Sequence, residues 1–181
     1  MDIAEFAALD LLFLVIAAAL LLSEKRDWSW RTVAVRLGLE RPASIRKLLA
    51  DTVQLSIVLL GIAWITSSLI TAFFPADLAN VENLAHALAD AGPLVLVYLF
   101  LVRVATEELL FRGALVPRIG ILPSALVFGI GHITYASIAQ VVGALVAGLV
   151  LGAYFFERKS LWPPFFAHLL YNAIALGASI G

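Results

Sequence analysis

The sequence predicts an all-α fold, a bundle of about six transmembrane helices that forms one integral membrane domain over residues 1–181. The first observation is composition: 62% of the residues are hydrophobic and 14% are charged, whereas soluble domains have about 45–50% and about 25%. The second is that the apolar residues gather in runs long enough to cross a bilayer. The third is that the basic residues outside those runs all fall on one side of a six-helix path.

A bilayer-spanning helix needs about 20 largely apolar residues. Six segments meet or approach this length, at residues 6–22, 52–74, 93–113, 122–136, 138–156 and 161–180. The first is interpreted as a retained transmembrane helix, because its N-terminal flank is acidic where a cleaved signal peptide would be basic. The fourth is short and contains Gly129 and Gly131, so we expect it to be tilted or broken.

The loops between these segments predict the orientation. The basic loops, together with the segment ends that join them, hold Lys25, Arg26, Arg31, Arg36, Arg41, Arg46, Lys47, Arg112, Arg118, Arg158 and Lys159. The loop between the second and third segments has no basic residue and carries Asp77, Glu82 and Asp90. The positive-inside bias therefore predicts a multi-pass protein of the cell membrane, with the basic loops in the cytoplasm and both termini outside.

Short stretches between the spans suit the membrane interfaces. Trp28 and Trp30 fit the cytoplasmic interface. Residues 44–51 combine basic and apolar side chains, so we expect them to lie along that interface before the second span begins.

The acidic loop repeats apolar residues at helical spacing, at Leu78, Val81, Leu84 and Leu88. Gly92 follows this pattern and is a plausible helix stop. We expect a short helix that rests on the outer leaflet, with His86 as an ordinary surface residue.

Four charged residues interrupt the third apolar segment: Arg103, Glu107, Glu108 and Arg112. Exposed to lipid, this set would cost on the order of 10 kcal/mol, so the charges must face a protein interior, a wet cavity or the interface. Arg103 and Glu107 share a helix face, as do Glu108 and Arg112, because each pair is four residues apart. The two glutamates lie about 100° apart around the helix axis and have different surroundings. Taken alone, the set also fits an intrahelical ladder of salt bridges.

Two later segments carry polar residues at the same spacing. FGIGH places Phe128 and His132 on one face of the fourth segment, and HLLYN places His168 and Asn172 on one face of the sixth. Each pair alone fits a packed histidine or hydrogen bonding between helices. Polar groups on three helices at about one membrane depth indicate a shared functional site.

The three motifs EExxxR, FxxxH and HxxxN occur in this order on successive apolar segments. They resemble the signature of the CPBP family, the CAAX prenyl proteases of the second type with their bacteriocin-processing and abortive-infection (Abi) relatives. The matching residues are Glu107, Glu108, Arg112, Phe128, His132, His168 and Asn172. The core that bears this signature covers about residues 93–181.

The resemblance implies a glutamate-dependent intramembrane endopeptidase. Glu107 would be the general base, and His132 would help to hold and polarise the attacking water. His168 and Asn172 would stabilise the oxyanion.

The resemblance also implies supporting roles. Glu108 would be oriented by Arg112, and Phe128 would pack against the site. A close ion pair with Arg103 would weaken Glu107 as a base. We therefore predict that Arg103 points toward the cytoplasmic or lateral surface and leaves Glu107 free.

Other functions use the same residue types. Glu107, His132 and His168 are acceptable zinc ligands, but the HExxH spacing of zinc proteases is absent, and we expect no cofactor. A proton-coupled transporter, or a non-enzymatic binding or immunity module, would also suit such a cluster, although the sequence lacks the repeat that many transporters show. The chain has no cysteine, which excludes a thiol nucleophile. Its net charge of -1 gives no footprint for nucleic acid.

We expect the third, fourth and sixth segments to enclose one polar cavity. Because the glutamates lie near the cytoplasmic end of the third segment, we expect this cavity to open to the cytoplasm or the inner leaflet. The partners that fit such a site are the lipid bilayer and a membrane-embedded or lipidated peptide or protein substrate.

Overall fold

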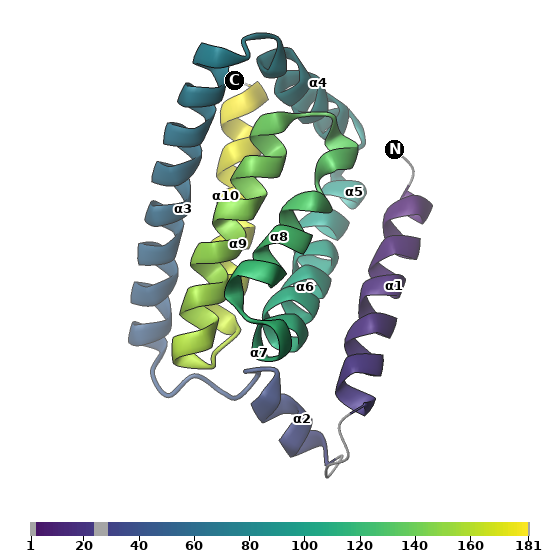
Figure 1. Cartoon of the computed structure of the whole chain (residues 1–181), viewed down its shortest axis with the longest axis vertical. Helices are drawn as coiled ribbons and strands as arrows, with labels where there is room; N and C mark the ends of the chain where they lie inside the picture. The colour runs from purple at the N-terminus through teal and green to yellow at the C-terminus, as the bar shows by residue number, and fades with distance from the viewer. Residues whose placement is uncertain (1–2, 24–28, 181) are drawn as a thin grey trace.

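The structure, a computed structural model, describes residues 3–23 and 29–180. The described residues are almost entirely helical and contain no β-strand, which confirms the predicted all-α class (Figure 1). Among them, α3 (Ile45–Phe73) and α9 (Ile138–Arg158) are long and apolar enough to cross a membrane by length and composition. Ala7–Leu22 and Ile121–Tyr135 are shorter apolar helices. The six-span arrangement therefore stays a prediction.

The remaining helices follow the order that the apolar segments predict. Their bounds are α1 (Ile3–Leu22), α2 (Trp30–Arg36), α4 (Ala76–Asp90), α5 (Pro93–Val97), η1 (Tyr98–Arg103), α6 (Val104–Glu107), η2 (Glu108–Leu115), α7 (Val116–Ile119), α8 (Ile121–Ile130), η3 (Ile133–Tyr135) and α10 (Trp162–Ile180). Figure 1 shows α9 and α10 in the middle of the bundle, with α3 on one side and α1 on the other.

The second helix begins earlier than predicted. Residues 44–51 form the first turns of α3 and not a separate interfacial segment, so that prediction is wrong. Ser44 caps α3 by accepting a hydrogen bond from the Lys47 N–H, and no glycine or proline breaks the helix before its middle. The short helix near this interface is α2, where Trp30 is exposed. Lys25, Arg26 and Trp28 lie outside the described residues.

The third predicted segment is one helical rod that runs on to residue 119. Pro93 occupies its first turn, where the missing N–H costs no hydrogen bond. Gly120 ends it with a φ of 86°, a conformation that glycine adopts without steric penalty. Two stretches within it, η1 and η2, are π-helical.

The fourth predicted segment is broken, as expected. Its helix α8 ends at Ile130, just before Gly131, and the chain continues into the short 3-10 turn η3. Ala136 then takes a left-handed φ of 54° before Ser137 caps α9. The break places His132 at the end of a helix, where its side chain is not confined to a helix face.

Small residues let α8 and α9 pack closely. A Cβ at Gly148 would lie 3.1 Å from the Cα of Ala125, and a Cβ at Gly129 would lie 3.0 Å from the Cβ of Leu145. Close approach through small residues is a usual basis of helix packing in membranes. On the other side of α9, an apolar cluster joins it to α3 and α10, with Leu59, Leu151 and Ala167 at its centre.

The end of the bundle that carries the basic loops is filled by packed side chains. Val116, Phe155 and Leu161 form a buried cluster there. The Leu161 N–H donates to the Gly38 carbonyl oxygen over 2.9 Å, which holds the segment after α2 across this end. Gly38 has a φ of 68°, and a Cβ there would lie 2.8 Å from the Phe155 ring.

Helix α4 forms the opposite end and is anchored by Asp77. This buried carboxylate accepts hydrogen bonds from the Ser137 hydroxyl and from the N–H groups of Ile138 and Ala139, over 2.8–2.9 Å. Asn80 adds a bond from its side-chain amide to the Ala136 carbonyl oxygen, 2.8 Å long. The helix is therefore fixed to the connection between α8 and α9.

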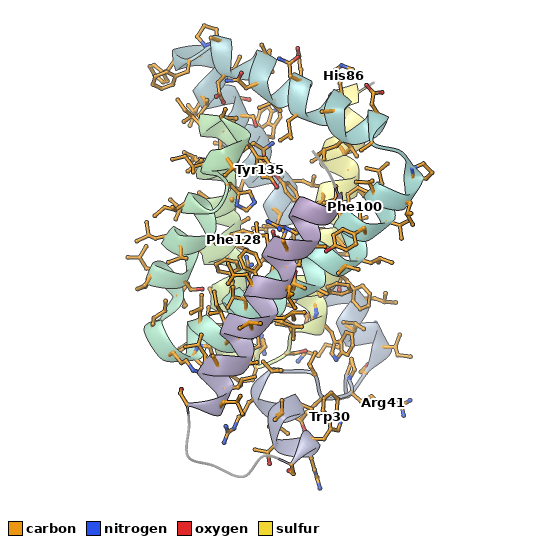
Figure 2. The ribbon with its side chains drawn as sticks, turned by 90° about the vertical axis from the view of Figure 1, so that its right-hand side faces the viewer. Trp30, Arg41, His86, Phe100, Phe128 and Tyr135 are labelled. Carbon is orange, nitrogen blue, oxygen red and sulfur yellow. The ribbon has the colours of Figure 1, made fainter. Side chains whose placement is uncertain are left out.

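The apolar face of α4 turns toward the bundle. Val81, Leu84 and Leu88 line a cavity, while Leu78 is 44% exposed. The helix was predicted correctly. Its apolar face covers the cavity, and its position on the outer leaflet stays a prediction. His86 is exposed, as predicted. Figure 2 shows His86 at this end and Trp30 and Arg41 at the other.

Replacing Asp77 tests the anchoring of α4. Burial alone would raise the pKa of Asp77, but the hydrogen bonds it accepts outweigh burial and hold the pKa below its usual value. This contribution to stability is present above about pH 4 and is lost as the pH falls through the depressed folded-state value. We expect Asp77→Ala to lower the free energy of unfolding in detergent by about 1–3 kcal/mol at pH 7.

The difference between Asp77→Ala and the parent should shrink in unfolding curves measured at progressively lower pH. Glu82→Ala, on an exposed position of the same helix, is the matched control. An equal loss for both variants would show that the Asp77 hydrogen bonds do not hold α4.

Candidate active site

The glutamates lie where the third rod changes from α- to π-helical geometry. Glu107 ends α6 and Glu108 begins η2. Single π-turns within α-helices occur frequently at functional sites. Both side chains are buried, at 5% and 0% exposure.

Glu107 is paired with Arg103. The Arg103 Nε donates to Glu107 Oε1 over 2.8 Å. The other carboxylate oxygen, Oε2, lies 3.9 Å from the Nε2 of His168. The prediction that Arg103 points to the surface and leaves Glu107 free is wrong: Arg103 is itself buried and lies one helical turn before Glu107 on the same face.

Asp10 of α1 explains why Arg103 turns inward. Its Oδ1 lies 3.1 Å from Arg103 Nη1 and 2.9 Å from the Thr106 hydroxyl. Its Oδ2 accepts a 2.6 Å hydrogen bond from the Tyr98 hydroxyl. Asp10 is 2% exposed, so it gives the guanidinium a second buried carboxylate. Sequence reasoning missed this residue, although a carboxylate inside the first apolar segment was a usable signal.

Glu108 contacts a different arginine and a histidine. Its Oε1 lies 3.0 Å from Arg112 Nη1 and 2.8 Å from His168 Nδ1. The Arg112 N–H groups have no well-aligned hydrogen bond among the described residues, so the contact with Glu108 is an ion pair. The guanidinium lies 4.5 Å from the centre of the Phe128 ring, a cation–π arrangement. The expected contact between Glu108 and Arg112 is present.

The two histidines are oriented in the same way. His132 Nδ1 lies 2.8 Å from the Phe128 carbonyl oxygen, and His168 Nδ1 lies 2.8 Å from a Glu108 oxygen. A carbonyl or carboxylate oxygen only accepts, so each Nδ1 carries a proton and donates it. In the neutral ring, Nε2 is then left as an acceptor. Both histidines line the cavity.

Phe128 is the apolar centre of the site. It is 2% exposed, and its ring contacts Phe111, His132 and His168 edge-on, with centroid distances of 4.8, 4.7 and 6.0 Å. His132 has backbone angles of -90° and 0°, in a sparsely populated region where many active-site residues lie. Figure 2 shows Phe128 near mid-height of the molecule and Tyr135 at a height between Phe128 and His86.

These residues meet at a cavity of about 170 Å³ that is lined by Glu107, His132, His168 and Asn172. The three predicted segments thus supply one shared site. Four further polar residues line it that sequence reasoning did not single out: Tyr135, Gln140, Tyr171 and Ser179. Glu108, Arg112 and Phe128 do not line this cavity and lie behind it.

A second cavity of about 90 Å³ adjoins the first. His132, His168 and Asn172 line both. The helices α3 and α9 contribute mostly small residues to the wall of the second cavity: Ala63, Thr66, Ser67, Ala139, Gly143, Ala144 and Ala147.

The main cavity extends from Glu107 toward the α4 end. Its walls include Leu84 of α4, Leu96 near the start of the third rod and Ser179 near the end of α10. The predicted opening toward the cytoplasm or the inner leaflet stays a prediction, because the lining residues do not show where the cavity opens. Among the described residues, no three His, Asp or Glu side chains are arranged to hold a metal ion.

The comparison with known protein families matches the part of the chain that holds the site. Residues 88–174 match the family model described as type II CAAX prenyl endopeptidase Rce1-like. This range, which is similar to the family, is called the Rce1-like domain below. The Rce1-like domain contains all seven signature residues, and it leaves α1, α2 and α3 outside. No curated protein and no solved structure matches the chain.

The Rce1-like domain points to a CAAX-protease-type enzyme embedded in a membrane. The two long apolar helices α3 and α9 fit a membrane location. Asp10 lies outside the matched range, so this contact with Arg103 comes from a part of the chain that the family match does not cover.

Replacing Asp10 tests its hold on the Arg103–Glu107 pair. Asp10→Asn removes one of two carboxylates from a buried guanidinium, and we expect it to lower the free energy of unfolding by up to about 3 kcal/mol. Asp90→Asn, the same substitution at an exposed position, should leave the melting temperature in detergent unchanged.

A double-mutant cycle with Arg103→Gln separates this contact from a general effect on α1. The two substitutions should be non-additive, because each removes the same interaction. Strictly additive losses would mean that Asp10 stabilises the fold without acting on Arg103.

Proposed function

We propose that the protein is an intramembrane endopeptidase that hydrolyses a peptide bond in a membrane-associated or lipid-modified substrate. The observation that supports this best is the meeting of Glu107, His132, His168 and Asn172 at one cavity of an Rce1-like domain. Peptide hydrolysis needs a deprotonated water, a stabilised oxyanion and a protonated leaving amine. The site offers a group for each need.

Glu107 and His132 would activate the water. Because Arg103 occupies Glu107 Oε1, Oε2 is the oxygen available to take a proton. The positive charge of Arg103 is shared between Glu107 and Asp10. The acceptor Nε2 of His132 provides the second contact for the same water.

His168 and Asn172 would stabilise the oxyanion. The Asn172 amide donates hydrogen bonds without changing protonation. His168 donates from Nε2 only as an imidazolium, because its Nδ1 proton already points at Glu108. The buried Glu108 carboxylate stabilises that cation. A protonated His168 would also be a proton donor for the leaving amine.

The competing functions use the same cluster. A proton-coupled transporter or a non-catalytic binding or immunity module would need the buried charges but no oxyanion donors. The Rce1-like domain favours the protease. The zinc alternative is tested by the chelation arm of the assay below.

Replacing Glu107 tests the function. In proteoliposomes with membrane-tethered peptides, we expect Glu107→Gln to reduce the cleavage rate by about 10²–10⁴-fold, the usual contribution of a general base. Glu82→Gln, on an exposed face of α4, should cleave at the wild-type rate. Prior treatment with a strong zinc chelator should change neither rate.

Equal cleavage by wild type and Glu107→Gln would reject Glu107 as the base. Failure of the wild type to cleave any tethered peptide would favour the binding module. Loss of activity with the chelator, restored by added zinc, would favour the metal alternative.

Filling the second cavity tests where a substrate side chain lies. We expect a side chain next to the scissile bond to enter this cavity, which adjoins His168 and Asn172. A Cβ at Gly143 would meet no atom within 4 Å, so Gly143→Leu should fold and fill the space. Cleavage of peptides with Val or Leu at that position should fall by about 10–200-fold relative to peptides with Gly.

Gly61→Leu is the matched control, because Gly61 lies on exposed α3 surface, has the same free space and does not line the cavity. An unchanged side-chain preference in Gly143→Leu would show that substrates do not use the second cavity.

A further inference from the structure

Gln140 lies where the two cavities meet. It lines both of them, as do His132, His168 and Asn172, so it shares a wall with three of the residues that the proposed mechanism uses. Glu107 lines the main cavity and not the second one. A substrate that passes these groups with one side chain in the second cavity therefore has its main chain along this shared wall.

The backbone of Gln140 belongs to the anchored start of α9. Its N–H donates to the Ser137 hydroxyl oxygen over 3.2 Å. The two residues before it, Ile138 and Ala139, donate their N–H groups to Asp77 of α4. The first turn of α9 is thus held by hydrogen bonds to side chains, and it gives the Gln140 side chain a fixed starting point at the cavity wall.

A glutamine at this position of a helix often has a structural role. In the capping box, a glutamine three residues after a capping serine accepts a hydrogen bond from the serine N–H. Ser137 and Gln140 have this spacing, but within the described part of the chain the Gln140 carboxamide makes no hydrogen bond. The capping box therefore does not explain this side chain.

Tyr171 is the other polar residue outside the sequence motifs that lines both cavities. Its ring packs against the apolar cluster that contains Leu59, Leu151 and Ala167, so packing accounts for its presence. Gln140 belongs to none of the buried apolar clusters of the described residues. A carboxamide without a hydrogen bond is costly in an apolar bundle, and a polar ligand in the cavity would remove that cost.

We propose that the Gln140 carboxamide binds the main chain of the substrate next to the scissile bond. The inference rests on the proposed function for its substrate. A peptide that enters the cavity leaves bulk water, so its N–H and C=O groups need partners there. A carboxamide has both an acceptor and a donor, so Gln140 accepts from a peptide N–H and donates to a peptide C=O. This contact recognises the main chain of any substrate and aligns the scissile bond with His168 and Asn172.

Gln140→Met tests the contact, because methionine keeps the length of the side chain and removes both hydrogen bonds. In proteoliposomes with membrane-tethered peptides, we expect KM to rise about 10-fold and kcat to change by less than about two-fold. This is the pattern of a contact made equally in the ground state and the transition state. Gln54→Met, at an exposed position of α3 that lines neither cavity, should leave both constants unchanged.

Melting curves in detergent verify that Gln140→Met and Gln54→Met are folded. Gln140→Ala provides a second variant, because alanine favours the helix and also removes both hydrogen bonds. An unchanged KM in a folded variant of Gln140 would overturn the inference.

A rise in KM can also come from a displaced α9, so the substrate is altered as well. Each amide near the scissile bond, the scissile amide excepted, is replaced in turn by an ester, which removes one main-chain N–H and keeps the side chains. At one position, the ester should raise the wild-type KM about 5-fold and leave the KM of Gln140→Met unchanged, because both changes remove the same hydrogen bond. Additive losses at every position, or no loss at any position, would overturn the inference.

Binding measurements separate this result from the proposed function. The affinity of the amide and ester peptides, each carrying a fluorescent label, is measured in Glu107→Gln with and without Gln140→Met. Coupled losses of affinity without cleavage by the wild type would support the contact and contradict the protease. Cleavage by the wild type with additive losses would contradict the contact alone. Absence of both binding and cleavage would contradict both.

Discussion

Burial of charge inside an apolar bundle is the constraint on which the rest of the structure depends. A buried guanidinium that loses its partner costs several kcal/mol, and the third rod buries two, Arg103 and Arg112. Each has a glutamate four residues away, and each is completed by a group from another helix. Asp10 of α1 contacts Arg103, and the ring of Phe128 on α8 covers Arg112. The positions of α1 and α8 follow in part from these contacts.

The adjacent glutamates have different roles because their side chains leave the helix in different directions and meet different surroundings. Glu108 is fully buried and holds the Nδ1 side of His168, whereas Glu107 lines the cavity on the Nε2 side of the same ring. One histidine therefore connects a structural carboxylate to a cavity carboxylate. This arrangement orients His168 without occupying the nitrogen that faces the cavity.

The sequence predicted a feature correctly where that feature depends on residues close together in the chain. Four-residue spacing correctly paired Glu108 with Arg112, and the glycines of the fourth segment correctly marked the break before His132. Arg103 was misjudged because its direction depends on Asp10, which lies 93 residues earlier in the chain. The start of α3 was misjudged because charge suggested an interfacial segment, while the cap at Ser44 and continuous helix-forming residues made one long helix.

Sequence by itself determined the all-helical class, the apolar segments, the charge asymmetry and the set of motif residues, because periodicity, hydropathy and spacing are local properties. Only the tertiary structure decided which partners the buried charges have, that α4 covers the cavity, and that the cavity extends away from the basic loops. These features depend on how helices distant along the chain pack against one another. Such packing is determined by contacts between segments, such as the hydrogen bond from the Ile138 N–H at the start of α9 to Asp77. The sequence of one segment alone does not specify these contacts.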